Sequence, residues 1–332
     1  MIEKIIQRID GLLKKANYET LALGNFDTKK SKFCFDLLVK KDDLVFSIKI
    51  FHNIDSLNQD TIRDIKSLSL ILKSKPLLIG IRNRYQKLED NTIYVREGLP
   101  FITLNTFENI LNDKYPYILA RRGGGVVFLD GALMKTLREN CSITRKELSE
   151  VLGVTKRTIC SYENESMRPS DKTAERILEI LNNDDLFKKI NIFGWTIKDN
   201  IEGKEVLEEQ ELSEFESHVQ DIIKDIGLSS YWYKKGSIPF KLSLYSRSDK
   251  IKLDGFYPLF SGISEEQDKI NEMSFHCLKM FTDLFNKTSL FIIDNDIKIP
   301  EPFKKINIPI VKIKNLEDVD DEEEFIELIQ DS

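Results

Sequence analysis

The stretch Thr144-Arg-Lys-Glu-Leu-Ser-Glu-Val-Leu-Gly-Val-Thr-Lys-Arg-Thr-Ile-Cys-Ser-Tyr-Glu-Asn164 decides the fold of the central part of the chain. Its first residue and Glu147 have the spacing of a capping box, which predicts the start of a helix. Gly153 permits a tight turn, because glycine adopts positive φ without steric cost. Thr155 is a typical N-cap for a second helix, and Ser149 is small enough for the two helices to cross closely. The spacing therefore predicts a helix, a tight turn and a second helix.

Two further amphipathic segments complete a small helical domain. The segments 131–140 and 171–181 each carry apolar residues on one face, so we expect four short helices around one core between 130 and 185. The stretch quoted above resembles the Cro/C1-type (XRE-like) helix-turn-helix family. This resemblance implies a domain of four to five helices in which the recognition helix, 156–164, lies in the major groove of DNA.

The resemblance also indicates candidate DNA-binding residues. Lys156 and Arg157 are assigned to base edges, because cationic side chains donate to guanine O6 and N7. Phosphate contacts are assigned to Arg145, Lys146 and the free amides at Thr155. The full candidate set is Arg145, Lys146, Thr155, Lys156, Arg157, Thr158, Cys160, Ser161 and Asn164. A thiol reads bases poorly, which makes Cys160 unusual in such a set.

Length and composition restrict the class of protein. The chain has 332 residues, too many for one core, which indicates two or three domains. It contains no apolar run near the ~20 residues that a membrane span needs, and its first residues lack the features of a signal or transit peptide. The four cysteines form no C-x-x-C pair, and the three histidines do not cluster. We therefore expect a cytoplasmic protein without a disulfide framework, metal site or cofactor.

The charge distribution favours selective rather than indiscriminate DNA binding. The net charge of −6 has the wrong sign for a protein that coats nucleic acid. Between 135 and 172, however, the sequence contains eight cations and six acids. Much of the acid lies elsewhere, as in 318–324, which we interpret as a charge cluster at a helix N-terminus.

The first 115 residues alternate helical and strand patterns. We expect helices at 2–13, 58–72 and from 106, and strands at 19–23, 32–39, 44–51, 77–81, 92–95 and 100–104. This order resembles the restriction-endonuclease or RecB-like nuclease superfamily, in which an acid on the second strand and a (D/E)-x-K on the third hold Mg²⁺. Here Asp36 and Ser47-Ile48-Lys49 occupy these places. Serine replaces one acid, so we expect a degenerate scaffold with no catalytic residues. The alternative is that Glu3 completes an active site.

The pattern recurs in the C-terminal third. We expect helices at 212–226, 265–285 and 322–329, and strands at 230–233, 240–245, 250–256, 289–293 and 309–313. Before the helical domain, Arg121-Arg-Gly-Gly-Gly125 indicates a hairpin or a flexible hinge, and not a nucleotide-binding loop. After that domain, 186–205 is too apolar for a free linker, so we expect it to pack against a neighbouring domain.

These segments predict four parts: a nuclease-like α/β domain at 1–115, a hairpin or hinge at 116–129, the helix-turn-helix domain at 130–185, and a second nuclease-like α/β domain at 186–332 for dimerisation or scaffolding. As a whole, the chain resembles the archaeal family of HTH-type transcriptional regulatory proteins. The resemblance is carried by Phe35-Asp-Leu-Leu38, Asn53-Ile-Asp-Ser-Leu57 and Pro76-Leu-Leu-Ile-Gly80, as well as by the central stretch.

The family resemblance implies a sequence-specific regulator of transcription that is not an enzyme. Its expected partners are double-stranded DNA and the transcription machinery. We expect a homodimer on an inverted repeat, because one recognition helix reads few base pairs. Two alternatives stay open at this point. One is a metal-dependent DNA nuclease targeted by the helix-turn-helix, and the other is a protein-interaction scaffold that no longer binds DNA.

Overall fold

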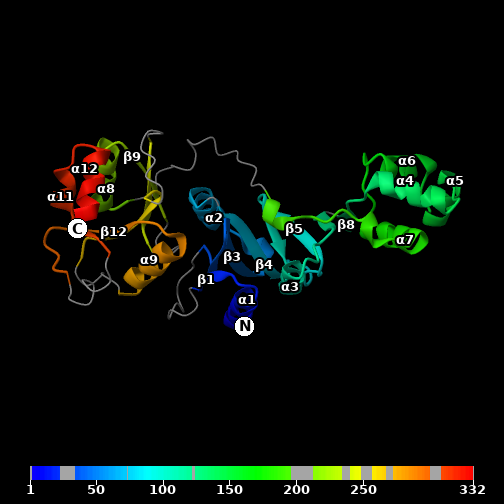
Figure 1. The fold of residues 1–332 in the computed structure, drawn as a ribbon, viewed down its shortest axis with the longest axis horizontal. Coiled ribbons are helices and arrows are strands. Elements are labelled where there is room, and N and C mark those ends of the chain that lie inside the picture. Colours follow the sequence, from blue (N-terminus) through cyan, green and yellow to red (C-terminus); the bar gives the residue numbers. More distant parts are fainter. Residues whose placement is uncertain are drawn as a thin grey trace. The chain divides into compact units, whose positions relative to one another are not determined.

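The structure, a computed structural model, describes residues 2–22, 34–72, 74–121, 124–195, 212–233, 240–247, 256–266, 272–299 and 308–331. The chain divides into two compact units, coloured along the sequence in Figure 1. The first unit comprises Met1–Ile50, Leu57–Pro76 and Lys198–Ser332, and the second comprises Phe51–Ser56 and Leu77–Ile197. Within the described ranges, no helix combines the length and the apolar character that crossing a membrane requires.

The N-terminal part of the first unit is a helix, an antiparallel meander and a second helix. Its elements are α1 (Ile2–Lys15), β1 (Glu19–Ala22), β2 (Leu37–Lys41), β3 (Leu44–Asn53) and α2 (Gln59–Ile71). The strand expected at 32–39 instead begins at Leu37, while residues 32 and 33 lie outside the described ranges. The hairpin turn is also shorter than expected, because Lys41 already pairs with Leu44. Asp42 makes this turn possible by adopting a left-handed backbone with φ of 52°.

The C-terminal part of the first unit contains a five-stranded sheet in the order β13-β12-β11-β10-β9. Its elements are α8 (Glu214–Asp225), β9 (Leu228–Trp232), β10 (Leu242–Ser246), β11 (Leu259–Ser264), α9 (Glu272–Phe285), β12 (Ser289–Ile293), β13 (Ile310–Lys312), α11 (Ile313–Glu317) and α12 (Glu322–Asp331). β9, β10 and β11 are antiparallel, whereas β12 and β13 run parallel to β11.

Two expectations for this part need correction. The strand predicted at 250–256 falls almost entirely outside the described ranges, and the strand that pairs with β10 is β11, which begins at Leu259. The strand expected at 309–313 is β13, which ends at Lys312, and Ile313 instead begins α11. Ile313 and Leu316, spaced by three residues, are both buried on one side of that helical turn.

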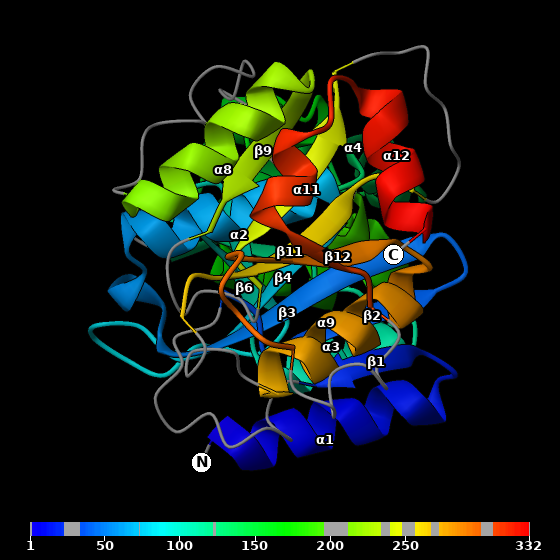
Figure 2. The ribbon, with the colours of Figure 1, turned by 90° about the vertical axis from the view of Figure 1, so that its left-hand side faces the viewer.

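The two α/β parts of the first unit share the order of a helix, three antiparallel strands and a second helix, and they contact each other reciprocally. The helix α9 contacts β1, and Figure 2 shows it beside β1 and β2. The Lys40 Nζ donates to the Leu284 carbonyl at the end of α9 at 3.1 Å. In the corresponding contact, the Tyr231 hydroxyl of β9 donates to Asp64 of α2 at 3.0 Å. Each crossover helix thus meets the first strand of the other part, as at a two-fold interface.

The expected repeat is not complete in detail. The first copy has three strands, β4, β5 and β6, between its crossover helix and its last helix α3. In the described part of the second copy, only β12 and β13 lie between α9 and α11. β4 and β6 pair in parallel, as β12 and β13 do, so β5 is the added antiparallel strand.

The strands of the second unit lead directly into the helical domain. They are β4 (Lys75–Arg82), β5 (Thr92–Arg96), β6 (Leu99–Ile102), β7 (Ile118–Arg121) and β8 (Gly124–Val127), with α3 (Leu104–Leu111) capped by Thr103. β6 is parallel to β4 and antiparallel to β5, while β7 is parallel to β5 and antiparallel to β8. These directions place the end of β4, the start of β5 and the end of β8 at one edge of the sheet.

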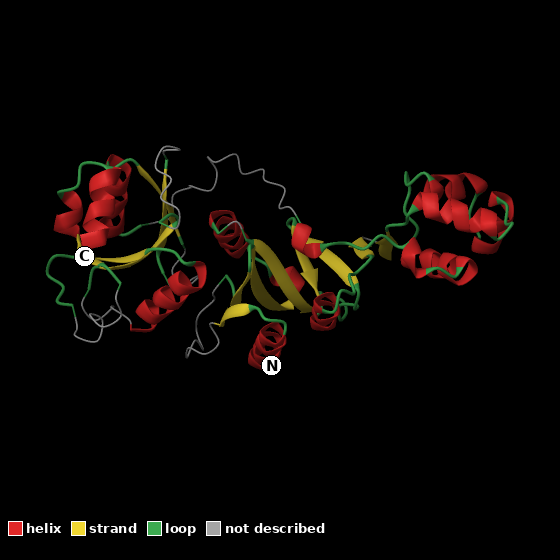
Figure 3. Cartoon of the chain, viewed as in Figure 1, coloured by secondary structure: helices red, strands yellow, loops and turns green. Residues whose placement is uncertain are grey.

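The helical domain forms as expected, with α4 (Gly131–Asn140), α5 (Arg145–Leu152), α6 (Lys156–Glu163) and α7 (Asp171–Leu181), drawn as red coils in Figure 3. Residues before and after these helices share their core, as Leu129 and Phe187 pair in a β-bridge. The glycine-rich segment is a hairpin in which Arg121 pairs with Gly124. Of the apolar segment 186–205 that was expected to pack, residues 196–205 lie outside the described ranges. In its described part, Leu186 is fully buried and the Trp195 indole donates to the Gly98 carbonyl at 3.1 Å.

Candidate nucleic-acid interface

The helix-turn-helix begins and ends at the residues that its sequence predicts. The Thr144 hydroxyl accepts the Glu147 amide at 3.2 Å, and the Glu147 carboxylate accepts the Thr144 amide at 2.7 Å, which completes the capping box. That backbone hydrogen bond lowers the pKa of the Glu147 carboxyl. Gly153 ends α5 with φ of +69°, and Thr155 accepts the Thr158 amide at 3.1 Å at the start of α6. The turn and both caps are therefore confirmed.

Small residues permit close approaches of the helices at two places. Ser149 is 5% exposed, and its hydroxyl donates back to the Lys146 carbonyl at 2.7 Å. The second place was not anticipated from the sequence. At Gly131, the start of α4, an added Cβ would lie 2.1 Å from the Glu163 carbonyl oxygen at the end of α6. Only glycine leaves space for that contact.

A buried carboxylate holds the recognition helix from behind. The Glu163 side chain is 1% exposed and accepts from Arg138 Nε at 2.7 Å and from Arg145 Nε at 2.7 Å. Arg138 also donates to the Ile143 carbonyl at 2.9 Å, which ties the loop before α5 to the same cluster. Burial raises the pKa of the Glu163 carboxyl, but the two guanidinium groups outweigh that effect and lower it. α4, α5 and α6 are thereby joined at one charged centre, which the sequence analysis missed.

The candidate residues of α6 divide by exposure. Lys156, Arg157 and Asn164 are exposed, while Ile159 and Tyr162 are buried and anchor the helix. The remaining candidates on α6, Thr158, Cys160 and Ser161, are half-buried. The Thr155 hydroxyl is exposed, although it lies 2.8 Å from that of Thr158. The Asn164 amide nitrogen lies 3.5 Å from the Cys160 sulfur, which gives the unusual thiol one polar neighbour.

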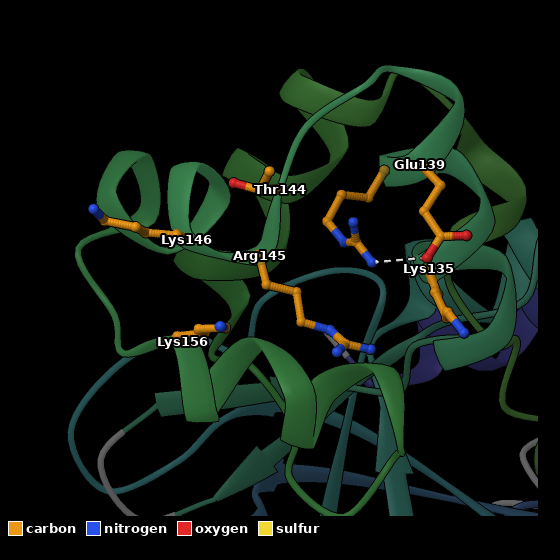
Figure 4. A pocket seen from close by; sticks show the side chains of 7 residues that line it. Lys135, Glu139, Thr144, Arg145, Lys146 and Lys156 are labelled. Atoms are coloured by element: carbon orange, nitrogen blue, oxygen red, sulfur yellow. Dashed lines mark hydrogen bonds and ion pairs between the residues drawn. The ribbon is translucent and has the colours of Figure 1, made fainter.

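A cationic pocket lies beside the start of α6, where α4 and α5 meet it. Figure 4 shows Arg145 pointing into this pocket and Lys146 pointing away from it. Lys146 is 78% exposed at its side chain and lies 3.9 Å from Glu150. The lining residues are Lys135, Arg138, Glu139, Thr144, Arg145, Lys146 and Lys156. Five cations and one acid create a positive potential that attracts anionic groups such as phosphate.

At the positions where the nuclease pattern expects metal ligands, the side chains are bound by the protein's own groups or are buried. Asp36 lies just before β2, and its carboxylate accepts from Lys49 Nζ at 2.9 Å and from the Ile50 amide at 2.7 Å. Both oxygens are therefore engaged by N–H donors. Ser47 is buried at the position of the missing acid, and Glu3 is exposed on α1. In the part of the chain that the structure describes, no three His, Cys, Asp or Glu side chains gather as metal ligands. A donor set of one carboxylate and an ammonium does not fit a divalent cation.

Two family models match parts of the chain. Residues 2–116 match the model of the PD-(D/E)XK superfamily domain, and residues 134–185 match that of the helix-turn-helix. No solved structure matches the chain.

Curated archaeal relatives cover most of the chain. A protein of Methanocaldococcus jannaschii is 31% identical over 90% of this chain and 88% of its own length. One of Methanobrevibacter smithii is 31% identical over 99% and 97%, and one of Archaeoglobus fulgidus is 32% identical over 77% and 78%. All three carry the name "Putative HTH-type transcriptional regulatory protein". With its nuclease-like and helix-turn-helix domains in the same chain, this protein belongs to that family.

Proposed function

We propose that this protein is a sequence-specific, double-stranded-DNA-binding regulator of transcription that inserts α6 into the major groove. The observation that carries the proposal is the two-sided character of α6. Its inner side is fixed by Ile159, Tyr162 and the buried Glu163 carboxylate, while Lys156 and Arg157 stay exposed at its N-terminal end. Helix-turn-helix proteins contact base edges with that end of the recognition helix.

The surrounding cations supply the contacts that position the helix on DNA. We assign Lys146, the amides after Thr155 and the exposed part of Arg145 to phosphate oxygens. Arg145 has a second role, because it is ion-paired with Glu163 at 2.7 Å while its side chain stays 35% exposed. Base contacts are assigned to Lys156, Arg157 and Asn164, with Thr158, Cys160 and Ser161 at the edge of the contact.

We further propose that two chains bind an inverted repeat. One recognition helix of eight residues reads few base pairs, and two half-sites about one helical turn apart restore specificity. In this proposal, 1–115 and 186–332 form a catalytically inactive scaffold, 116–129 connects it to the DNA-binding domain 130–185, and the scaffold mediates pairing of chains and contact with the transcription machinery. The engagement of both Asp36 oxygens favours this interpretation over a nuclease.

DNA capture from a library of genomic fragments tests the proposal. The full-length chain is incubated with the library at two salt concentrations and with Mg²⁺, and bound fragments are sequenced. Intact fragments that share an inverted repeat are expected. They should be lost with Lys156→Ala/Arg157→Ala and retained with a charge-matched control, Lys4→Ala/Lys15→Ala, which removes two exposed lysines of α1.

The other outcomes identify the alternatives. Cleaved fragments, with cleavage abolished by Asp36→Ala, would establish a nuclease. Absence of enrichment at the lower salt concentration would support a protein-interaction scaffold. Enrichment that the Lys156/Arg157 variant leaves unchanged would contradict the assigned role of α6.

A further inference from the structure

The loop between β4 and β5 carries a basic surface that the helix-turn-helix does not explain. Its residues 82–87, Arg-Asn-Arg-Tyr-Gln-Lys, include three cations and no acid. Arg82, Arg84 and Lys87 are all exposed. Tyr85 is 85% exposed, and it is the only aromatic among the large apolar side chains that are exposed in the described ranges. We call residues 82–87 the basic loop.

The basic loop is held in one conformation by its own hydrogen bonds. The Asn83 side-chain oxygen accepts the Tyr85 amide at 2.8 Å and the Gln86 amide at 2.7 Å. The Asn83 amide donates to the Gln86 carbonyl at 2.9 Å, and Arg82 forms a β-bridge with Lys87. The exposed tyrosine therefore projects from a braced turn, so little conformational entropy is lost when it contacts a partner.

Asp55 and Asp90, two acids near the basic loop, are hydrogen-bonded to other residues, whereas Glu89 beside it is exposed. The Asp55 carboxylate accepts the Arg84 amide at 2.8 Å and the Arg96 guanidinium at 2.7 Å. Burial raises the pKa of Asp55, but these hydrogen bonds outweigh it and hold the pKa below its usual value. Asp90, beyond the loop, accepts from the Thr103 hydroxyl and from Asn105 at 3.0 Å. The loop's three cations, Arg82, Arg84 and Lys87, therefore outnumber the one adjacent carboxylate, that of Glu89, for which no such hydrogen bond is seen, and the surface stays positive.

Sheet topology places the basic loop at the edge from which the helix-turn-helix domain begins. The loop leaves the end of β4 and enters the start of β5, and both lie at the same edge as the end of β8. α4 begins four residues after β8, at Gly131. With ~4.8 Å between neighbouring strands, the start of β5 is about 10 Å from the end of β8 and the end of β4 about 19 Å. These spans are shorter than one turn of duplex DNA, about 34 Å.

We propose that the basic loop is a second DNA contact, in which Arg84 and Lys87 bind phosphates of the duplex that flanks the site read by α6, and Tyr85 packs against the same backbone. Arginine, lysine and tyrosine side chains all make such positioning contacts. This inference rests on the proposed function. It adds an anchor outside the helix-turn-helix, so DNA longer than one half-site is bound more tightly than the half-site alone.

Salt-dependent binding of the full chain tests this inference. The probe is a fluorescein-labelled random-sequence duplex of about 40 base pairs, roughly four helical turns, and binding is measured by anisotropy between about 50 and 200 mM salt. Arg84→Ala/Lys87→Ala retains the Arg84 backbone amide that bonds Asp55. It should lower the slope of log affinity against log salt by about 1.8, since each phosphate contact contributes about 0.9. Affinity at the lower salt concentration should fall about tenfold or more.

Two further variants separate the contribution of Tyr85 and of net charge from that of the loop's cations. Tyr85→Ala should weaken binding without changing the salt slope, because it removes no charge. The control Lys4→Ala/Lys15→Ala removes the same net charge from exposed positions of α1 and should leave both quantities unchanged.

Failure of this inference is distinguishable from failure of the proposed function. If the wild-type chain does not bind the duplex at the lower salt concentration, both the proposed function and the second DNA contact are refuted. If Lys156→Ala/Arg157→Ala abolishes binding while the basic-loop variant binds with unchanged affinity and slope, the proposed function stands and the second contact is refuted. Equal losses in the basic-loop variant and in the α1 control would also refute it, because the effect would then follow net charge alone.

Discussion

Two carboxylates, Glu163 in the helix-turn-helix and Asp36 in the nuclease-like part, are each bound by cations, with different consequences for their surroundings. Glu163 is bound from inside the domain by Arg138 and Arg145, and the outer side of α6 remains exposed. Asp36 has its oxygens bound by Lys49 and the Ile50 amide, at the place where a nuclease would hold metal. An ion pair on the inner side of α6 thus leaves its outer side chains exposed, whereas the pair at Asp36 engages the carboxylate that the nuclease pattern assigns to metal.

The largest effect is expected for Glu163→Gln. Removing the charge leaves the buried Arg138 guanidinium without its ion pair to Glu163 and also breaks the pair with the partly exposed Arg145, and breaking a buried pair typically costs about 3–5 kcal/mol. The free energy of unfolding of the helical domain should fall accordingly, with loss of DNA binding. Hydrogen exchange of the α6 amides in the full chain measures this. Unchanged protection would show that Glu163 does not fix the recognition helix.

The same carboxylate predicts an acid-sensitive domain. The folded-state pKa of Glu163 is lowered from its usual 4.5, so the stabilisation is present above that value and is lost as pH falls through the folded-state pKa. Protection of the α6 amides should therefore decrease at acidic pH in the wild-type chain. Glu163→Gln should show a smaller decrease, and equal decreases in both proteins would exclude Glu163 as the titrating group.

Gly131→Ala tests the close approach behind α6. The new Cβ would lie 2.1 Å from the Glu163 carbonyl oxygen, so the helices must move apart. Overpacking of this kind costs about 1–3 kcal/mol. Thermal unfolding measures the change. Gly153→Asn is the comparison variant and should cost less stability than Gly131→Ala, because asparagine tolerates the left-handed backbone there. Equal stability of Gly131→Ala and the wild type would contradict the packing at α4.

Asp36→Ala tests the other side of the comparison. It leaves Lys49 Nζ and the Ile50 amide without this acceptor, at a cost of about 1–3 kcal/mol in the free energy of unfolding. DNA affinity should be unchanged, since no DNA contact is assigned to this residue. Denaturant unfolding and anisotropy are measured on the same protein. If the variant is fully folded but binds DNA more weakly, Asp36 would have a role in DNA binding.

The smallest effect is expected for Tyr231→Phe. This change removes the hydroxyl that donates to Asp64 where α2 meets β9, worth about 1 kcal/mol. Ser243→Ala is a suitable comparison, because it removes a hydroxyl that lies 2.9 Å from that of Tyr233 within the C-terminal sheet. If Tyr231→Phe alone increases hydrogen exchange in α2, the contact between the two α/β parts is supported. Unchanged exchange would show that it contributes nothing.

Local signals predicted the elements well where they depended on neighbours in sequence. The caps Thr144 and Thr155 and the turn at Gly153 each follow from residues within three or four positions. The strand β11 was not predicted, because it pairs with β10 between residues far apart in sequence, such as Ser243 and Phe260. The roles of Gly131 and Glu163 were missed because these residues meet across 32 positions of the chain.

The sequence by itself determined the helical domain, its turn and caps, and the loss of an acid at Ser47, because these depend on residue type and short-range spacing. Only the tertiary structure decided that Glu163 joins three helices, that the two α/β parts pack reciprocally, and that the basic loop lies at the edge where α4 begins. These features depend on contacts between distant segments, and spacing along one chain carries no direct information about which distant faces meet.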